Sequence, residues 1–330
     1  MMKRAIFSLG FSFLIFTFST IVFAKPFSKN LTDFEYPFDV HTMAFESQGQ
    51  GLAMAYMHLP AKEGQPTVLL LHGKNFASSY WETTANWLHE QGYGVVIPDQ
   101  IGFGKSDKPI NYQYSFAALA NNTKQLLTSL NLEDVIVTGH SMGGMVASRF
   151  ALNYPESVSK LVLINPIGLE NYLQYVDYKD VEFFQQNELK KTPENIVNYQ
   201  KTNYYDGDWN DTYAFHASHL MGWIEGDDWP QLAKVSALTY DMIFTQPVIE
   251  EFDRFQVPVT LILGTRDRTG PGRGWKKEGG TRELGRYDRL GAEVKARNNA
   301  ITVKELDGLG HLPHIEGFSR FIKLYEEALD

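Results

Sequence analysis

One serine in this sequence stands in a setting that suits nucleophilic catalysis. Ser141 has Gly139 two positions before it and Gly143 two positions after it, which is a G-x-S-x-G pattern. A serine hydroxyl is a weak nucleophile, and it must stand clear of the backbone within reach of a base and a substrate carbonyl. A sharp turn between a strand and a helix presents the hydroxyl in this way. Without catalytic partners, the same pattern would be an ordinary glycine-rich turn.

The residues around Ser141 predict the two elements that this turn requires. Residues 135–137 form a short apolar run, and a helical pattern begins directly after Gly143. Glycines are expected on both sides of the serine because a Cβ atom there would crowd the turn. The start of the helix would direct free N–H groups and a positive dipole end toward developing negative charge.

Other strands and helices alternate around this turn. Continuous apolar runs are typical of strands buried on both faces of a sheet. They occur at residues 67–71, 95–97, 135–137 and 161–164. Residues 257–264 are expected to resume the sheet and residues 300–306 to form its last strand, and helical patterns occur at residues 79–91, 116–130 and 318–329. Parallel strands need crossovers, which are right-handed helices packed on the sheet. The sequence therefore predicts an α/β fold with a mostly parallel, doubly wound sheet, and a hairpin within residues 40–58 forms its antiparallel edge.

The alternation of strand and helix breaks between residues 168 and 255. This segment is aromatic, polar and helix-like, and it contains no apolar strand pattern. Because it lies between two predicted strands, we interpret it as an inserted helical cap or lid over the site; a helical face packed on the main core is the alternative. The predicted domains are a core of residues 25–167 and 256–330 and a cap of residues 168–255. Residues 25–38 are expected to form a loose lead-in.

Residues 1–24 have the composition of a secretory signal peptide. Lys3 and Arg4 give a basic start, and an apolar run then continues without charge to Ala24. Val22 and Ala24 supply small residues at the positions that define a cleavage site. We expect cleavage after Ala24, an exported protein that is periplasmic or secreted, and no stable membrane span after cleavage. An uncleaved anchor is the alternative, because the run approaches the length of a membrane span.

The composition excludes several classes of function. The chain has 330 residues and no cysteine, which rules out disulfides, thiol catalysis and a thioether-linked lipid anchor. Its formal charge of −9 becomes −11 if Lys3 and Arg4 leave with the signal peptide. Together with the lack of a basic stripe, this charge argues against a nucleic-acid partner.

These motifs resemble the α/β-hydrolase superfamily, and the resemblance covers about residues 40–330. In that family the catalytic order is serine, acid, histidine, each at the carboxyl end of a strand. The resemblance implies that Ser141 is the nucleophile and that Asp267, after the strand that resumes beyond the cap, is the orienting acid. Some members place the acid one strand earlier, where this sequence has Asn165. The base would be His311, in the loop after the last strand.

Alternatives exist for the acid and for the base. His311 follows a glycine and precedes a proline as in the family's G-H-x-P motif, so His314 is the competing base and is expected to line or support the loop. Asp267 could instead be a solvated loop carboxylate, or it could pair with Arg266 or Arg268.

The resemblance also implies two backbone donors for the oxyanion. Met142 follows the nucleophile at the start of the helix, and Lys74 occupies the variable position of a segment that matches the family's H-G-x loop. We therefore expect the N–H groups of Met142 and Lys74 to form the oxyanion hole, with Asn75 as the alternative to Lys74. His72 is expected to bond within its loop rather than act as a second base.

Two further features were considered as binding sites. His216 and His219 share a predicted helix face, but a zinc site needs a third ligand, so no metal and no cofactor are expected. Residues 268–297 are glycine-rich and basic. They could form a clamp for an anionic substrate, although a solvated loop followed by an amphipathic helix is the preferred interpretation.

The sequence thus predicts a serine hydrolase that cleaves a carboxylic ester of a small molecule through an acyl-enzyme. The aromatic cap suggests an apolar acyl or aryl substrate of modest size. The same residues also support C–C, amide or lactone hydrolysis or acyl transfer, and a non-enzymatic binding module on this fold is a further alternative. The oligomeric state stays open.

Overall fold

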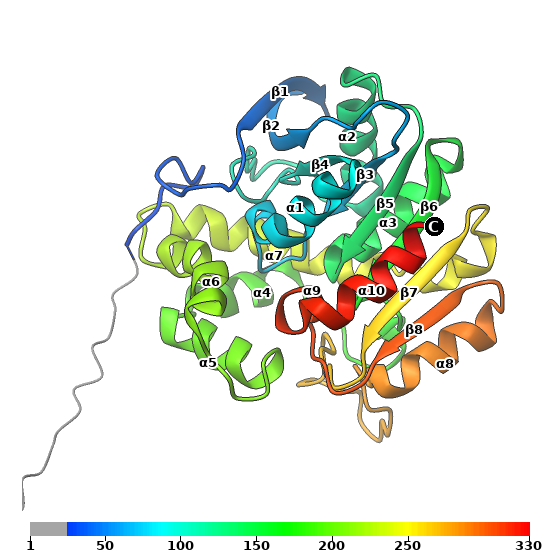
Figure 1. Cartoon of the computed structure of the whole chain (residues 1–330). Coiled ribbons are helices and arrows are strands. Elements are labelled where there is room, and N and C mark those ends of the chain that lie inside the picture. Colours follow the sequence, from blue (N-terminus) through cyan, green and yellow to red (C-terminus); the bar gives the residue numbers. More distant parts are fainter. Residues whose placement is uncertain (1–24) are drawn as a thin grey trace, which may run out of the picture.

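The computed structural model describes residues 25–330, which form one eight-stranded sheet with helices on both faces (Figure 1). The strands follow the order β1-β2-β4-β3-β5-β6-β7-β8. They are β1 Val40–Ser47, β2 Gln50–Leu59, β3 Thr67–Leu71, β4 Gly94–Pro98, β5 Val135–His140, β6 Val158–Ile164, β7 Val259–Gly264 and β8 Thr302–Leu306. Strand β2 pairs antiparallel with β1 and β4, and the other neighbouring strands pair in parallel. The predicted mostly parallel α/β sheet with an antiparallel edge is confirmed.

Alternate side chains of the central strands enter two separate buried clusters. In β3, Leu69 and Leu71 belong to one cluster, whereas Val68 and Leu70 belong to the other, on the opposite face. This arrangement explains why the central strands read as continuous apolar runs, since a strand covered on both faces has no polar side.

The helices carry the chain between the strands. The α-helices are α1 Glu82–Gln91, α2 Phe116–Ser129, α3 Met142–Asn153, α4 Val181–Leu189, α5 Pro193–Asn203, α6 Asp211–Ile224, α7 Trp229–Thr245, α8 Tyr287–Arg297, α9 Pro313–Glu316 and α10 Phe318–Leu329. Short 3₁₀ helices are η1 Ser78–Trp81, η2 Pro155–Ser157, η3 Tyr172–Gln174 and η4 Ile249–Arg254.

Helices α4 to α7 occupy the connection between β6 and β7, within the segment predicted as a cap (Figure 1). Helix α4 packs against α7, and α5 packs against α6. Helix α5 begins at a capping box, in which Thr192 and Asn195 bond each other's backbone N–H groups and Pro193 occupies the first turn. The division into core and cap domains stays a prediction.

Residues 25–38, which we call the N-terminal arm, pack against the helices of this connection. The Phe27 N–H donates to the Gly222 carbonyl at 3.0 Å, and the Trp223 indole donates to the Ser28 carbonyl at 3.0 Å. Leu31 and Phe34 are buried in an apolar cluster with residues of α6 and α7. The arm has no regular secondary structure, but the expected loose lead-in is wrong, because Leu31 and Phe34 anchor it in a buried cluster.

The predicted signal peptide, residues 1–24, lies outside the described residues. Across residues 25–330, no helix combines the length and the apolarity that crossing a membrane requires.

Candidate active site

Ser141 occupies a strained turn between β5 and α3. Its φ of 57° and ψ of −122° fall in a region that non-glycine residues rarely adopt, at a cost on the order of 1–3 kcal/mol. Close packing around the turn requires both flanking glycines. A Cβ atom on Gly139 would lie 2.3 Å from the Gly143 carbonyl oxygen, and one on Gly143 would lie 2.2 Å from the Leu71 carbonyl oxygen. The turn is thus held by backbone packed directly on backbone.

The structure brings Ser141, His311 and Asp267 together at the carboxyl ends of the strands. His311 Nε2 lies 3.0 Å from Ser141 Oγ, and His311 Nδ1 lies 2.6 Å from Asp267 Oδ2. All three side chains are buried, and Ser141 is the most accessible at 7% exposed. These distances permit a proton to pass from the hydroxyl to the imidazole while the carboxylate holds the opposite ring nitrogen.

Asp267 is held by three donors in addition to its position after β7. The Thr269 N–H donates to Oδ1 at 2.7 Å, and Asn165 Nδ2 and His311 Nδ1 donate to Oδ2. Burial alone would raise the pKa of Asp267, but the charge and hydrogen bond of His311, with the bonds from Thr269 and Asn165, lower it below the ordinary value. The carboxyl group is therefore kept ionised inside the protein.

The arginines beside Asp267 have other partners. The Arg266 guanidinium pairs with Glu316, whose second oxygen accepts the Gly310 N–H at 2.6 Å. The Arg268 guanidinium lies 3.5 Å from Asp288. The alternatives in which Asp267 pairs with either arginine, or is solvated, do not match this structure. Arg266 instead ties the strand end to the loop that carries the base.

His314, the competing base, is placed away from the hydroxyl group. Its ring stacks on Trp81 with centroids 4.7 Å apart, and burial lowers its pKa well below the ordinary value. The His314 side chain supports the loop, as expected.

Three further residues help to position the base. The sequence did not predict this role for any of them. His140 Nε2 donates to the His311 carbonyl at 2.8 Å. Asn165 Oδ1 accepts the Gly264 N–H at 2.8 Å and so links β6 to the acid. The Tyr204 ring stacks on the His311 ring with centroids 4.7 Å apart. Asn165 could have been found as a polar residue at the end of a buried strand, but Tyr204 follows α5 in an irregular stretch that carries no such signal.

The loop after β3 lies against the nucleophile. A Cβ atom on Gly73 would lie 3.0 Å from the Ser141 Cβ atom. His72 accepts the Gln100 N–H at 3.1 Å and bonds the Gly73 carbonyl at 2.9 Å, so it holds this loop. Among residues 25–330, the N–H groups of Lys74, Asn75 and Met142 have no protein acceptor, so the choice between Lys74 and Asn75 as the second oxyanion donor stays a prediction.

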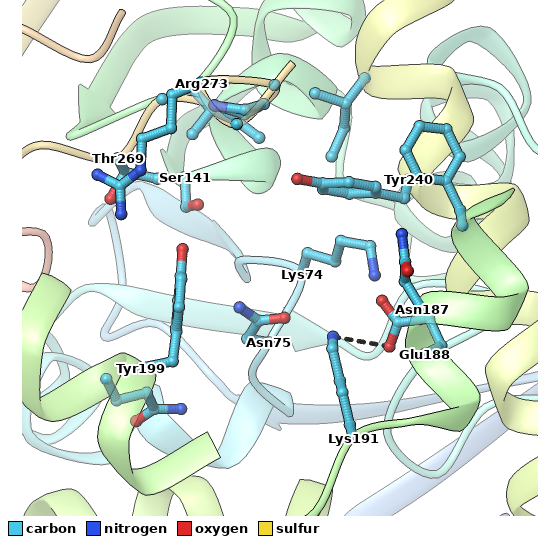
Figure 2. Close-up of a pocket in the computed structure, with 18 of the residues that line it drawn as sticks. Lys74, Asn75, Ser141, Asn187, Glu188, Lys191, Tyr199, Tyr240, Thr269 and Arg273 are labelled. Atoms are coloured by element: carbon cyan, nitrogen blue, oxygen red, sulfur yellow. Dashed lines mark hydrogen bonds and ion pairs between the residues drawn. The ribbon is translucent and has the colours of Figure 1, made fainter. Parts of the chain in front are cut away.

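A cavity of about 390 Å³ opens beside Ser141 (Figure 2). Helices α4 to α7, the loop after β3 and the glycine-rich residues 269–274 form its walls. The apolar part of the lining consists of Ile167, Phe184, Ile196, Leu220, Ile243 and Trp275. The polar part includes Lys74, Asn75, Asn187, Glu188, Lys191, Asn195, Tyr199, Gln200, Tyr240 and Arg273. The surface of the lining is mainly apolar, and these polar groups interrupt it.

The two histidines of α6 lie in the protein interior. Burial lowers the pKa of both His216 and His219 to about 4. Between residues 25 and 330, no group of three or more His, Asp or Glu side chains is arranged to hold a metal ion.

Comparison with known proteins defines the family. A sequence model described as the alpha/beta hydrolase fold matches residues 66–227. The crystal structure of a probable hydrolytic enzyme from Pseudomonas aeruginosa PAO1 is 42% identical with a TM-score of 0.90, over 93% of this chain and 99% of that chain. This chain belongs to the α/β-hydrolase family.

More distant matches cover shorter stretches or share the fold alone. An uncharacterised protein of Mycobacterium tuberculosis is 41% identical over 107 residues, which are 32% of this chain and 30% of that protein. A putative carbamate hydrolase of Serratia proteamaculans is 38% identical over 100 residues, 30% of this chain and 37% of that one. The chain thus spans about a third of the length of these curated relatives. An esterase from Exiguobacterium antarcticum shares the fold at 18% identity and a TM-score of 0.65, over 85% of this chain and 97% of that one.

Proposed function

We propose that this protein is a hydrolase that cleaves a carboxylic ester of a small molecule through an acyl-enzyme. The observation that carries the proposal is the continuous hydrogen-bonded relay from Asp267 through His311 to Ser141, which ends at a cavity. A strained serine, a buried histidine and a carboxylate kept ionised match the requirements of nucleophilic acyl transfer.

In the first half of the reaction, Ser141 Oγ attacks the ester carbon while its proton passes to His311 Nε2. The carbonyl oxygen gains the negative charge, and the N–H groups of Lys74 and Met142 stabilise it. The bond to the alcohol then breaks, and the proton on His311 passes to the leaving oxygen. The products of this half are the free alcohol and an ester of Ser141.

In the second half, a water molecule gives a proton to His311 and attacks the acyl carbon. The bond to Ser141 Oγ breaks, the proton returns to that oxygen, and the carboxylic acid leaves. Asp267 stays ionised throughout and stabilises the imidazolium twice per cycle. Helices α4 to α7 supply the walls that exclude bulk water during both halves.

A fluorophosphonate probe and a substrate panel test this proposal. Ser141 should be the labelled residue, and p-nitrophenyl butyrate should be cleaved faster than a matched lactone, carbamate or anilide. The Ser141→Ala variant should lose labelling and about 10⁶-fold in kcat, in line with removal of the nucleophile from a serine protease. Ser148→Ala is the matched control, since Ser148 lies in α3 and bonds the Gly144 carbonyl at 2.8 Å. Labelling that persists in Ser141→Ala, or a preference for one of the other bonds, would overturn the ester assignment.

A further inference from the structure

The charges that line the cavity have the opposite sign to the charge of the whole chain. The chain carries a formal charge of −9. The charged side chains in the cavity lining are Lys74, Lys191, Arg273 and Glu188, which are three cations and a single carboxylate. A negatively charged protein that gathers cations around one cavity raises the local concentration of an anionic ligand there.

The single carboxylate neutralises only one of these cations. Lys191 Nζ lies 2.7 Å from Glu188 Oε2, and Figure 2 shows this pair at the side of the cavity away from Ser141. Within residues 25–330, neither Lys74 nor Arg273 forms an ion pair. Arg273 contacts the Asn203 side chain and the Arg268 carbonyl, which are neutral groups.

Lys74 keeps hydrogen-bond donors that the described part of the protein does not use. Its amino group donates to Ser236 Oγ at 2.6 Å and lies 5.2 Å from the centre of the Tyr240 ring. An ammonium group has three donors, so two of them remain for a ligand. Burial lowers the pKa of Lys74 to about 8, while Glu188 acts to raise it and Lys191 to lower it further. A charge held in this way without a partner is costly, and an anion in the cavity would offset that cost.

We propose that the substrate carries a carboxylate, remote from the bond that is cut, which binds to Lys74 and Lys191. Figure 2 shows both amino groups on the Glu188 side of the cavity, apart from the Ser141 hydroxyl. The substrate class is thus an ester of a short dicarboxylic acid with one acid group free, and its apolar chain lies along Ile167 and Ile243. This inference rests on the proposed ester hydrolysis.

The test compares esters that differ only in the terminal group of the acyl chain. The pairs are the mono-p-nitrophenyl esters of adipic and pimelic acids and the p-nitrophenyl esters of hexanoic and heptanoic acids, with spontaneous hydrolysis subtracted. For the parent protein, kcat/KM of each carboxylated ester is divided by kcat/KM of its neutral partner. This ratio should be about 10. A ratio at or below one for both pairs would overturn the proposal.

Substitutions then identify the groups that set the ratio. Lys74→Met and Lys191→Met should each lower it by about tenfold, because each removes a charge-assisted hydrogen bond and keeps the length of the side chain. The ratio cancels any effect of Lys74 on the oxyanion, since both esters of a pair share that step. Lys190→Met is the matched control, because Lys190 is exposed, adjacent to Lys191 and absent from the cavity lining.

The Glu188→Gln variant should change the ratio in the opposite direction. This change removes the carboxylate of the lining and frees Lys191. Because it also removes a group that raises the pKa of Lys74, the ratio is compared at about pH 6, where it should rise. If the cavity instead recognised a cation through Glu188, the parent would disfavour the carboxylated esters, and cleavage of esters with a terminal ammonium group would fall in Glu188→Gln.

A binding measurement separates failure of this inference from failure of the proposed function. Adipate is titrated calorimetrically into Ser141→Ala, which needs no catalysis, and its Kd should weaken about tenfold when Lys74→Met is added. Adipate binding of this kind without probe labelling of the parent would keep the anion site and reject the esterase. If the parent cleaves neutral esters but Ser141→Ala does not bind adipate, the esterase proposal stands and the anion site is rejected.

Discussion

Asp267 shows how much of the relay depends on one carboxyl group. Burial opposes its charge, and the hydrogen bonds from His311, Thr269 and Asn165 restore it. An amide at this position would keep the shape of the side chain, but it would offer no charge to an imidazolium and would favour the wrong imidazole tautomer.

We therefore expect Asp267→Asn to lower kcat for a neutral ester by about 10⁴-fold, as the same change does in a serine protease. The measurement is the steady-state rate, with the urea unfolding midpoint as the control for an intact fold. A loss of less than about tenfold would show that Asp267 does not support the base.

Lys74 makes the preference for an anionic substrate depend on pH. Its charged and titratable neighbours are Glu188 on α4, Lys191 beyond the end of α4 and Tyr240 on α7. Because its pKa is lowered to about 8, Lys74 is a cation below that pH and becomes neutral as pH rises through it. Anion binding through Lys74 is lost in the same direction.

The ratio of kcat/KM for carboxylated to neutral esters should therefore be level up to about pH 7 and fall by pH 9. The Lys74→Met variant supplies the control, since its ratio should be low and level over that range. A parent ratio that does not change between pH 6 and 9 would contradict the assignment to Lys74. The chemical steps at Ser141 are shared by both esters of a pair and do not enter the ratio.

At this scale the sequence was informative about Ser141 and Asp267, because each follows a run that predicts a buried strand, and about His311 through the motif of its loop. Arg273 lies in the basic segment 268–297 that could clamp an anion. The sequence was uninformative about Tyr204 and about the side chains of Lys74 and Lys191 as cations of the cavity. These residues come from different helices and loops, and only tertiary packing makes them neighbours. Periodicity reports which side chains are buried, but not which loops meet.

At the scale of elements, the contact of α3 with β3 sets the position of the nucleophile. The Gly143 Cα faces the Leu71 carbonyl so closely that a methyl group would lie 2.2 Å from the oxygen. Both partners are backbone, so neither can move aside by a change of rotamer.

Gly143→Ala should destabilise the protein by about 1–3 kcal/mol, or prevent folding, because of overpacking. Urea unfolding measures the change. Gly274→Ala is the control, since a Cβ atom on Gly274 would meet nothing within 4 Å. Equal stability of the two variants would mean that α3 can shift away from the sheet without cost.

The core elements were predicted to within a few residues, and the other elements less well. Helix α10 spans the residues expected for the last helix, and β8 begins two positions later than expected. Core strands can be predicted from the sequence because burial on both faces removes polar residues from them. The helices between β6 and β7 share their apolar side chains among the core, the cavity and the N-terminal arm, so their individual boundaries could not be read from one periodic face.

At the scale of the whole molecule, the N-terminal arm joins the beginning of the described chain to α6 and α7. Phe34 is 6% exposed, and its ring contacts Phe27, Tyr36 and Phe215. Close packing also explains Gly222 in the last turn of α6, where a Cβ atom would lie 2.2 Å from the Phe27 ring. The arm therefore restrains two of the helices that form the cavity wall.

Phe34→Ala should release this restraint, because truncation of a buried phenylalanine costs about 3–5 kcal/mol where the site cannot collapse. Hydrogen exchange should accelerate in α6 while the exchange of β5 and β6 stays unchanged. Phe215→Ala is the control, since Phe215 stacks on Phe34 but is 42% exposed. Uniform acceleration over the whole sheet would mean that the arm stabilises the entire fold rather than the cavity wall.

The arm also affects the order in which parts of the chain can fold. The indole of Trp223 donates to a carbonyl 195 positions earlier in the chain, so the docking partners of the arm emerge from the ribosome long after the arm itself. A nascent polypeptide halted before Asp211 would carry Leu31 and Phe34 with no surface to receive them. The stretch made earliest among the described residues is thus one of the last to reach its final place.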